Sequence, residues 1–147
     1  MRVITRQVEN QPLTVIIEYP ELDKSASDLI KKINNLNFQF CAFDEDKQIR
    51  INLEEVYYIE NVERKMFIYT AKDVYRYNSS MAEIEDLIKG TEMVRISRTC
   101  IMNTDHLKEI RQVKNSHLEA LMDNDEMLIV SRKYLKDIKS VFKRGKQ

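Results

Sequence analysis

Residues 95–103 read RISRTCIMN, with two arginines three positions apart, a short apolar run and a terminal asparagine. Side chains alternate between the two faces of a strand, so Arg95 and Arg98 are predicted to point in opposite directions. An arginine can offer a planar fork of N–H donors to a phosphate or to the edge of a guanine. On residue type alone, a surface salt bridge is the favoured role of each arginine. The flanking sequence must decide between these roles.

The composition is that of a folded protein. The chain has 147 residues, of which 43% are hydrophobic and 33% charged, which suits one domain with or without a small extension. No apolar run approaches the roughly 20 residues of a membrane span, and the N-terminus lacks the apolar core of a signal peptide. Cys41 and Cys100 lie far apart in apolar runs, which indicates free thiols in a reducing cytoplasm.

The charges are unevenly distributed along the chain. The formal net charge is zero, which argues against a strongly basic nucleic-acid binder. However, residues 1–94 carry 12 Lys and Arg against 17 Asp and Glu, whereas residues 95–147 carry 12 against 7. Such an asymmetry indicates a basic binding face in the C-terminal part of the chain.

The first 45 residues predict one strand and one helix. Residues 13–19 (LTVIIEY) are rich in β-branched side chains and precede Pro20, which is typical of a strand that ends there. Apolar residues then recur at helical spacing from Leu22 to Ile33, which predicts an amphipathic helix that ends near Asn34 and Asn35. We therefore expect residues 1–45 to form a β–α extension of a domain over residues 46–147.

The rest of the chain is dominated by short strands. Alternating patterns and turn residues predict strands at residues 38–43, 48–51, 56–60, 66–71, 74–77, 94–97, 107–113, 117–122 and 126–130. A helix is predicted after Ser80, because Ser80 and Glu83 form a capping box, and Gly90 suits a left-handed end. The predicted fold class is therefore a β-rich α+β domain with short antiparallel strands.

A second helix is predicted at the C-terminus, from Ser131 or Arg132 to about Lys143. Its apolar side chains recur at helical spacing, and a basic stripe lies on another face. The stripe consists of Arg132, Lys136, Lys139 and Lys143.

Five segments carry motifs in a fixed order. They are residues 51–60 (INLEEVYYIE), 65–70 (KMFIYT), the helix at 79–90, the stretch at 95–103 and residues 130–136 (VSRKYLK). Together they resemble the LytTR DNA-binding domain family of bacterial transcriptional regulators, including its R-x-x-R-S-x-x-V-N signature. The resemblance covers about two thirds of the chain. It departs at Thr99 and Met102, and residues 61–64 lack the usual Gly-Asn, which leaves open whether Arg64 or Lys65 faces DNA.

The resemblance implies a DNA-binding site made of loops and strand ends, because family members read the major groove without a recognition helix. By position in the motifs, the resemblance implies that Arg98, Arg132 and either Arg64 or Lys65 read bases. A bidentate arginine–guanine contact is worth about 1–3 kcal/mol of discrimination against the wrong base. The candidates for DNA-backbone contacts are Arg95, Thr99, Lys108, Lys114, Lys133 and Lys136.

Arg95 and the lysines among the backbone candidates have structural alternatives. Arg95 either forms an ion pair inside the fold or contacts a phosphate, and each lysine either contacts the backbone or lies on a solvated face. Asn103 is expected to cap the turn before Leu107 rather than touch DNA.

The resemblance also implies the partners. They are double-stranded DNA with direct repeats, a second copy of the chain and, for compact family members, a membrane protein encoded nearby. A phospho-receiver domain needs about 120 residues, and only about 45 precede the match. We therefore expect a standalone, cytoplasmic regulator without a phosphorylation switch.

Other function classes find little support in the sequence. His106 and His117 have no further ligands at metal spacing, which argues against a zinc site, and the cysteines lack a catalytic His and Asn constellation. No P-loop, GxGxxG or HExxH motif occurs, so neither an enzyme nor a cofactor is expected. The alternatives are a protein-interaction module with edge strands and a solvated basic face, and a single-strand binder, which would need aromatic platforms.

Overall fold

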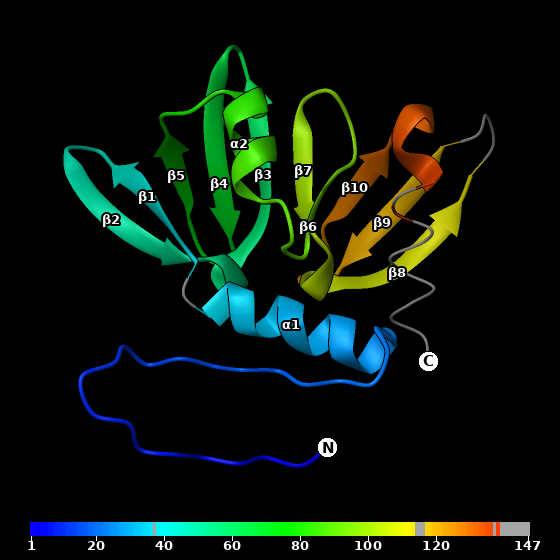
Figure 1. The fold of residues 1–147 in the computed structure, drawn as a ribbon. Coiled ribbons are helices and arrows are strands. Elements are labelled where there is room, and N and C mark those ends of the chain that lie inside the picture. Colours follow the sequence, from blue (N-terminus) through cyan, green and yellow to red (C-terminus); the bar gives the residue numbers. More distant parts are fainter. Residues whose placement is uncertain (37, 114–116, 137, 139–147) are drawn as a thin grey trace.

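The computed structural model describes residues 1–36, 38–113, 117–136 and 138. In this part of the chain the strands form a seven-stranded antiparallel sheet of order β2-β1-β5-β4-β3-β7-β6 and a three-stranded sheet of order β10-β9-β8 (Figure 1). The elements are α1 (Lys24–Leu36), β1 (Gln39–Asp44), β2 (Lys47–Asn52), η1 (Leu53–Glu55), β3 (Val56–Val62), β4 (Lys65–Thr70), β5 (Val74–Tyr77), α2 (Met81–Leu87), β6 (Met93–Arg95), β7 (Cys100–Asn103), η2 (Thr104–His106), β8 (Leu107–Gln112), β9 (Leu118–Met122), β10 (Met127–Val130) and η4 (Arg132–Tyr134). This confirms the β-rich α+β class.

One core lies between the large sheet and α2, which covers one of its faces (Figure 1). Strand residues alternate between buried and exposed, so that Phe40, Ile59 and Ile68 face inward and meet Ile84 of α2. The helix begins as predicted, because the Ser80 hydroxyl accepts a hydrogen bond from the backbone N–H of Glu83 at 3.2 Å.

A second core joins the two sheets. It contains Tyr58, Ile96 and Met102 from the large-sheet side and Leu118 and Val130 from the small sheet. Because β7 lies between the two cores, all four of its side chains are buried, with Ile101 in the first core. A strand that is buried on both faces has no alternation, which explains why β7 was not among the predicted strands.

The predicted strand at residues 13–19 is wrong. Those residues form no ladder, and Leu13 and Ile16 are 100% and 79% exposed. A strand is stable only when a neighbour satisfies its backbone groups, and no sheet edge of the described chain pairs with this segment. The predicted helix is present as α1.

Two other expectations concern the ends of the domain. The predicted boundary after residue 45 falls in the turn between β1 and β2, and β1 is part of the large sheet because it pairs with both β2 and β5. The C-terminal helix is described only at its start, where η4 leads into helical residues 135 and 136, and residues 139–147 lie outside the described chain. None of the helices described here is both long and apolar enough to span a membrane.

Candidate nucleic-acid interface

Three connections meet at one edge of the molecule, at the top of Figure 1. They are the β3–β4 turn (residues 63 and 64), the β6–β7 loop (residues 96–99) and η4, which follows β10. Backbone hydrogen bonds tie them together: Asn61 N–H donates to the Thr99 carbonyl at 2.8 Å, and Ser131 N–H donates to the Ile96 carbonyl at 2.8 Å. The fold thus brings Arg64, Arg98 and Arg132 to the same edge from three separate places in the sequence.

Arg95 supports this edge from inside. Its Nε donates to the Ser97 carbonyl at 2.9 Å, and its Nη2 donates to the Arg98 carbonyl at 2.7 Å. Its Nη1 pairs with the Glu85 carboxylate of α2, and its guanidinium carbon lies 5.7 Å from the ring centroid of Tyr134. The fold-supporting ion pair left open by the sequence is therefore present, and it holds the backbone of the loop that carries Arg98.

The side chains of the base-reading candidates are free of polar contacts with the described chain. Arg98, Arg132, Arg64 and Lys65 are exposed, and within the described chain none of them makes a side-chain hydrogen bond or ion pair. Loop 96–99 is ordered by its own polar groups, since the Thr99 N–H donates to the Ser97 hydroxyl at 3.2 Å. An ordered backbone with free arginine heads is well suited to contact a ligand from solution.

The β3–β4 turn distinguishes Arg64 from Lys65. It has two central residues, Glu63 with φ 52° and Arg64 with φ 68°, which is the type I′ turn that normally takes Asn-Gly. Lys65 is the first residue of β4 and pairs with Val62. Arg64 therefore occupies the turn itself, in a left-handed conformation that costs a non-glycine residue about 1–2 kcal/mol.

Replacing Arg64 by glycine is expected to raise the free energy of unfolding by about 0.5–1 kcal/mol, because relief of the left-handed strain exceeds the added entropy of the unfolded glycine. The same variant should bind DNA more weakly. The measurements are urea denaturation and a DNA titration. Glu63→Asn is the control, since it suits the turn and keeps the arginine, so DNA affinity should not fall. An Arg64→Gly protein that is less stable than the wild type would contradict the claim that Arg64 is strained.

The remaining sequence candidates divide by position. Thr99, Lys133 and Lys136 are exposed on the loop or beside Arg132. Lys108 lies 3.9 Å from Asp125 in the β9–β10 turn, at the end of β10 opposite to η4, so the fold does not bring it to this edge. Lys114 lies outside the described residues.

Sequence reasoning missed three residues near the edge. Glu85 and Tyr134 hold Arg95, and of these only Tyr134 had a local signal, since it belongs to the motif at residues 130–136. The third is Arg76 of β5, which lines a hollow of about 420 Å³ with Arg64 and Lys65. No nearby motif marks Arg76, because strand pairing alone places it there.

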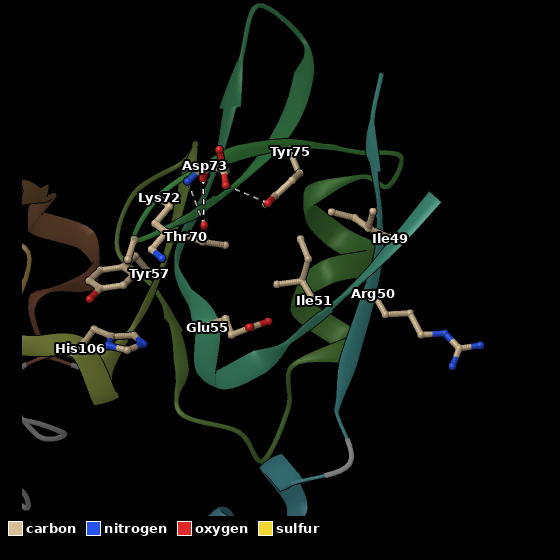
Figure 2. Close-up of a pocket in the computed structure, with 11 residues that line it drawn as sticks. Ile49, Arg50, Ile51, Glu55, Tyr57, Thr70, Lys72, Asp73, Tyr75 and His106 are labelled. Atoms are coloured by element: carbon tan, nitrogen blue, oxygen red, sulfur yellow. Dashed lines mark hydrogen bonds between the residues drawn. The ribbon is translucent and has the colours of Figure 1, made fainter. Parts of the chain in front are cut away.

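A second hollow, of about 500 Å³, lies between β2, the β4–β5 turn and His106 (Figure 2). The His106 ring stacks on Tyr57 with centroids 4.1 Å apart, and its Nε2 lies 2.6 Å from the Glu54 carbonyl. Its Nδ1 lies 3.1 Å from the Asp123 carboxylate. Hydrogen bonding to Asp123 and burial raise the pKa of Tyr57 to about 12, and the Tyr57 hydroxyl in turn lowers the pKa of Asp123. This cluster fastens the small sheet to the large one.

The cysteines have different surroundings. Cys41 is exposed and Cys100 is buried, and neither forms a disulfide. Burial raises the pKa of the Cys100 thiol far above its usual value, so that the reactive thiolate is disfavoured. Cys100 is a residue of the second core.

The family model of the LytTr DNA-binding domain matches residues 46–143, which include all three connections of the edge. The chain belongs to the LytTR family. The matched residues include the small sheet, α2 and every strand of the large sheet except β1.

Individual LytTR proteins are similar over the same region. The chain is 27% identical over 95 residues to the sensory transduction protein LytT of Enterococcus faecalis, covering 65% of this chain and 39% of that protein. It is 30% identical over 73 residues to the transcriptional regulatory protein LytR of Staphylococcus aureus, covering 50% of this chain and 30% of that protein. The chain thus spans less than half of the length of these relatives.

A solved LytTR structure has the same fold. The LytTr DNA-binding domain of a Bacillus cereus response regulator superposes with a TM-score of 0.66 at 25% identity, covering 71% of this chain and 95% of that chain. The strand-rich arrangement described above is therefore that of a LytTr DNA-binding domain.

Proposed function

We propose that the protein is a sequence-specific transcriptional regulator that reads double-stranded DNA with the edge formed by the β3–β4 turn, the β6–β7 loop and η4. The observation that carries this proposal is the convergence of three exposed arginines, Arg64, Arg98 and Arg132, on one edge with no partner in the described chain. Free guanidinium groups on an ordered backbone suit guanine O6 and N7 in the major groove.

Phosphate contacts flank the base readers in this proposal. Thr99 follows Arg98 in the sequence, and Lys133 and Lys136 lie one and four residues after Arg132. All three are exposed. Such contacts set the position and orientation of the protein on the duplex but carry no sequence information. Arg95 acts indirectly, by holding loop 96–99.

The assembly and location are also proposals. The chain acts in the cytoplasm, where two copies bind direct repeats side by side, and a membrane protein encoded nearby is a further partner. The exposed apolar side chains of the extension, such as Leu13 and Ile16, support a protein contact there. This contact adds to the DNA edge and does not replace it.

Arg98→Ala and Arg132→Ala test the proposal most directly. Each is expected to weaken binding to a site selected by the wild-type protein from a random duplex library by about 5-fold to 150-fold, since a bidentate base contact is worth about 1–3 kcal/mol. The preference over random DNA should fall by the same factor. Gel-shift titration at several salt concentrations measures both quantities.

Arg50→Ala is the matched control, because Arg50 is an exposed arginine on β2, away from the three connections. It should bind like the wild type. If the wild-type protein shows no preference over random DNA, the proposed function is wrong. If it does, and both arginine variants keep that preference, the assignment of the readers is wrong.

A further inference from the structure

The hollow beside the β3–β4 turn contains two cations, Lys65 and Arg76, that are not among the three arginines proposed to read bases. The reading edge is the edge formed by the β3–β4 turn, the β6–β7 loop and η4. It is lined by three cationic side chains, Arg64, Lys65 and Arg76, and by polar side chains of the β5–α2 connection. All three cations are exposed. Because Arg64 belongs to both the turn and the hollow, the hollow is continuous with the reading edge.

Arg76 has a defined position in this hollow. It pairs with Phe67 of the neighbouring strand β4, and its guanidinium carbon lies 5.9 Å from the Phe67 ring centroid. An aromatic face under a guanidinium group limits its freedom while leaving the N–H donors available. Within the described chain, no hydrogen bond or ion pair occupies those donors.

The charge in the hollow favours an anion. Glu83 is the acidic residue of the lining, and its carboxylate already accepts hydrogen bonds from the hydroxyls of Ser79 at 3.3 Å and Ser80 at 3.0 Å. Three cations against one engaged carboxylate leave a positive balance. A shallow, exposed and positively charged surface suits a phosphodiester group, which bears one negative charge and keeps part of its hydration.

We propose that Arg76, together with Lys65, binds a DNA backbone phosphate next to the base read by Arg64. This inference rests on the proposed function. It extends the DNA footprint beyond the β3–β4 turn to β5, in a place that no sequence motif marks. The contact strengthens binding to all sequences equally, because a phosphate is the same at every step of the duplex.

The test compares Arg76→Ala with Arg50→Ala, which removes an exposed arginine of the same sheet. Binding is measured on the selected site and on a random duplex of equal length, over a range of salt concentrations. Arg76→Ala should weaken binding to both duplexes by a similar factor, about 3-fold to 10-fold, and should reduce the salt slope by about one unit, as expected for one lost phosphate contact. Arg50→Ala should change neither quantity.

Single methylphosphonate substitutions in the selected site locate the contact. The neutral linkage that faces Arg76 should weaken wild-type binding but leave Arg76→Ala binding unchanged. If the wild type prefers the selected site and Arg76→Ala behaves like Arg50→Ala, this inference fails and the proposed function stands. A change in sequence preference for Arg76→Ala would also overturn it, since that would indicate a base contact. Only a wild type without sequence preference would overturn the proposed function itself.

Discussion

Replacement of Asn103 by aspartate should lower the free energy of unfolding by about 3–5 kcal/mol, which is the usual cost of an unpaired buried charge. Asn103 is fully buried. Its Nδ2 donates to the Leu53 carbonyl at 3.2 Å and to the Val56 carbonyl at 2.8 Å, and its Oδ1 accepts from the Asp105 N–H at 3.0 Å. A carboxylate would place a negative charge against two carbonyl oxygens.

Urea denaturation at pH 7 and at lower pH measures this effect. The loss should shrink as the pH falls toward the ordinary carboxyl pKa of about 4, because a protonated carboxyl group has no charge and can donate one hydrogen bond. Asn103→Ala should cost less, about 2–3 kcal/mol, since it leaves two carbonyls unsatisfied without adding charge. Asn78→Asp, at an exposed position, serves as the control and should change stability by less than about 0.5 kcal/mol. A small, pH-independent change in unfolding free energy for Asn103→Asp would contradict the claim that the buried amide of Asn103 stabilises the fold through its hydrogen bonds.

Replacement of Arg95 by alanine is expected to reduce both stability and DNA affinity. The side chain is 25% exposed and joins the Ser97 and Arg98 carbonyls to Glu85. Hydrogen bonds to a charged group are worth about 1.5–3 kcal/mol, and the partial exposure of the pair lowers its contribution. We therefore expect a loss of about 2–3 kcal/mol of unfolding free energy, measured by denaturation. Affinity for the selected site should fall roughly tenfold, because loop 96–99 loses its anchor.

Two further variants separate support of the loop from a phosphate contact. Arg95→Lys keeps the charge, but one ammonium group cannot reach acceptors that lie around a planar fork, so it should restore little of either property. Glu85→Gln removes the ion pair and leaves the bonds to the loop, so it should retain most of the affinity. A fully active Arg95→Lys protein would contradict the supporting role. A stable Arg95→Ala protein whose salt slope falls by about one unit would instead indicate a phosphate contact.

Most of the strands were predictable from the sequence because their residues alternate, as in β1, where buried Phe40 and Ala42 alternate with exposed Gln39 and Cys41. Strand prediction failed where the burial of a segment does not follow from its local sequence pattern. Residues 13–19 have strand composition but no neighbouring edge, and β7 is buried on both faces. Both outcomes are set by tertiary neighbours, which a local pattern does not contain.

The same limit applies to the candidate site. The family motifs at residues 95–103 and 130–136 marked Arg98 and Arg132, but they could not show that a bond from Ser131 to Ile96 joins the two segments. The role of Arg95 depends on Glu85 in α2 and on Tyr134 in η4, which are distant in sequence. Arg76 escaped notice because its relation to Arg64 arises from the pairing of β4 with β5. The motifs therefore identify some residues of the site, and the contacts between elements identify the others.

The bond between Ser131 N–H and the Ile96 carbonyl joins connections that belong to different sheets. Together with the guanidinium group of Arg95 over the Tyr134 ring, this bond links the β6–β7 loop to η4. In the proposed complex, this link between the β6–β7 loop and η4 fixes the distance between Arg98 and Arg132. The protein, and not the DNA, therefore sets the separation between the bases that the two arginines read. One additional base pair lengthens the duplex by about 3.4 Å. The distance between Arg98 and Arg132 does not increase to match this change. If the proposed function holds, the bound sites are expected to vary in the bases between the two contacts but not in the number of those bases.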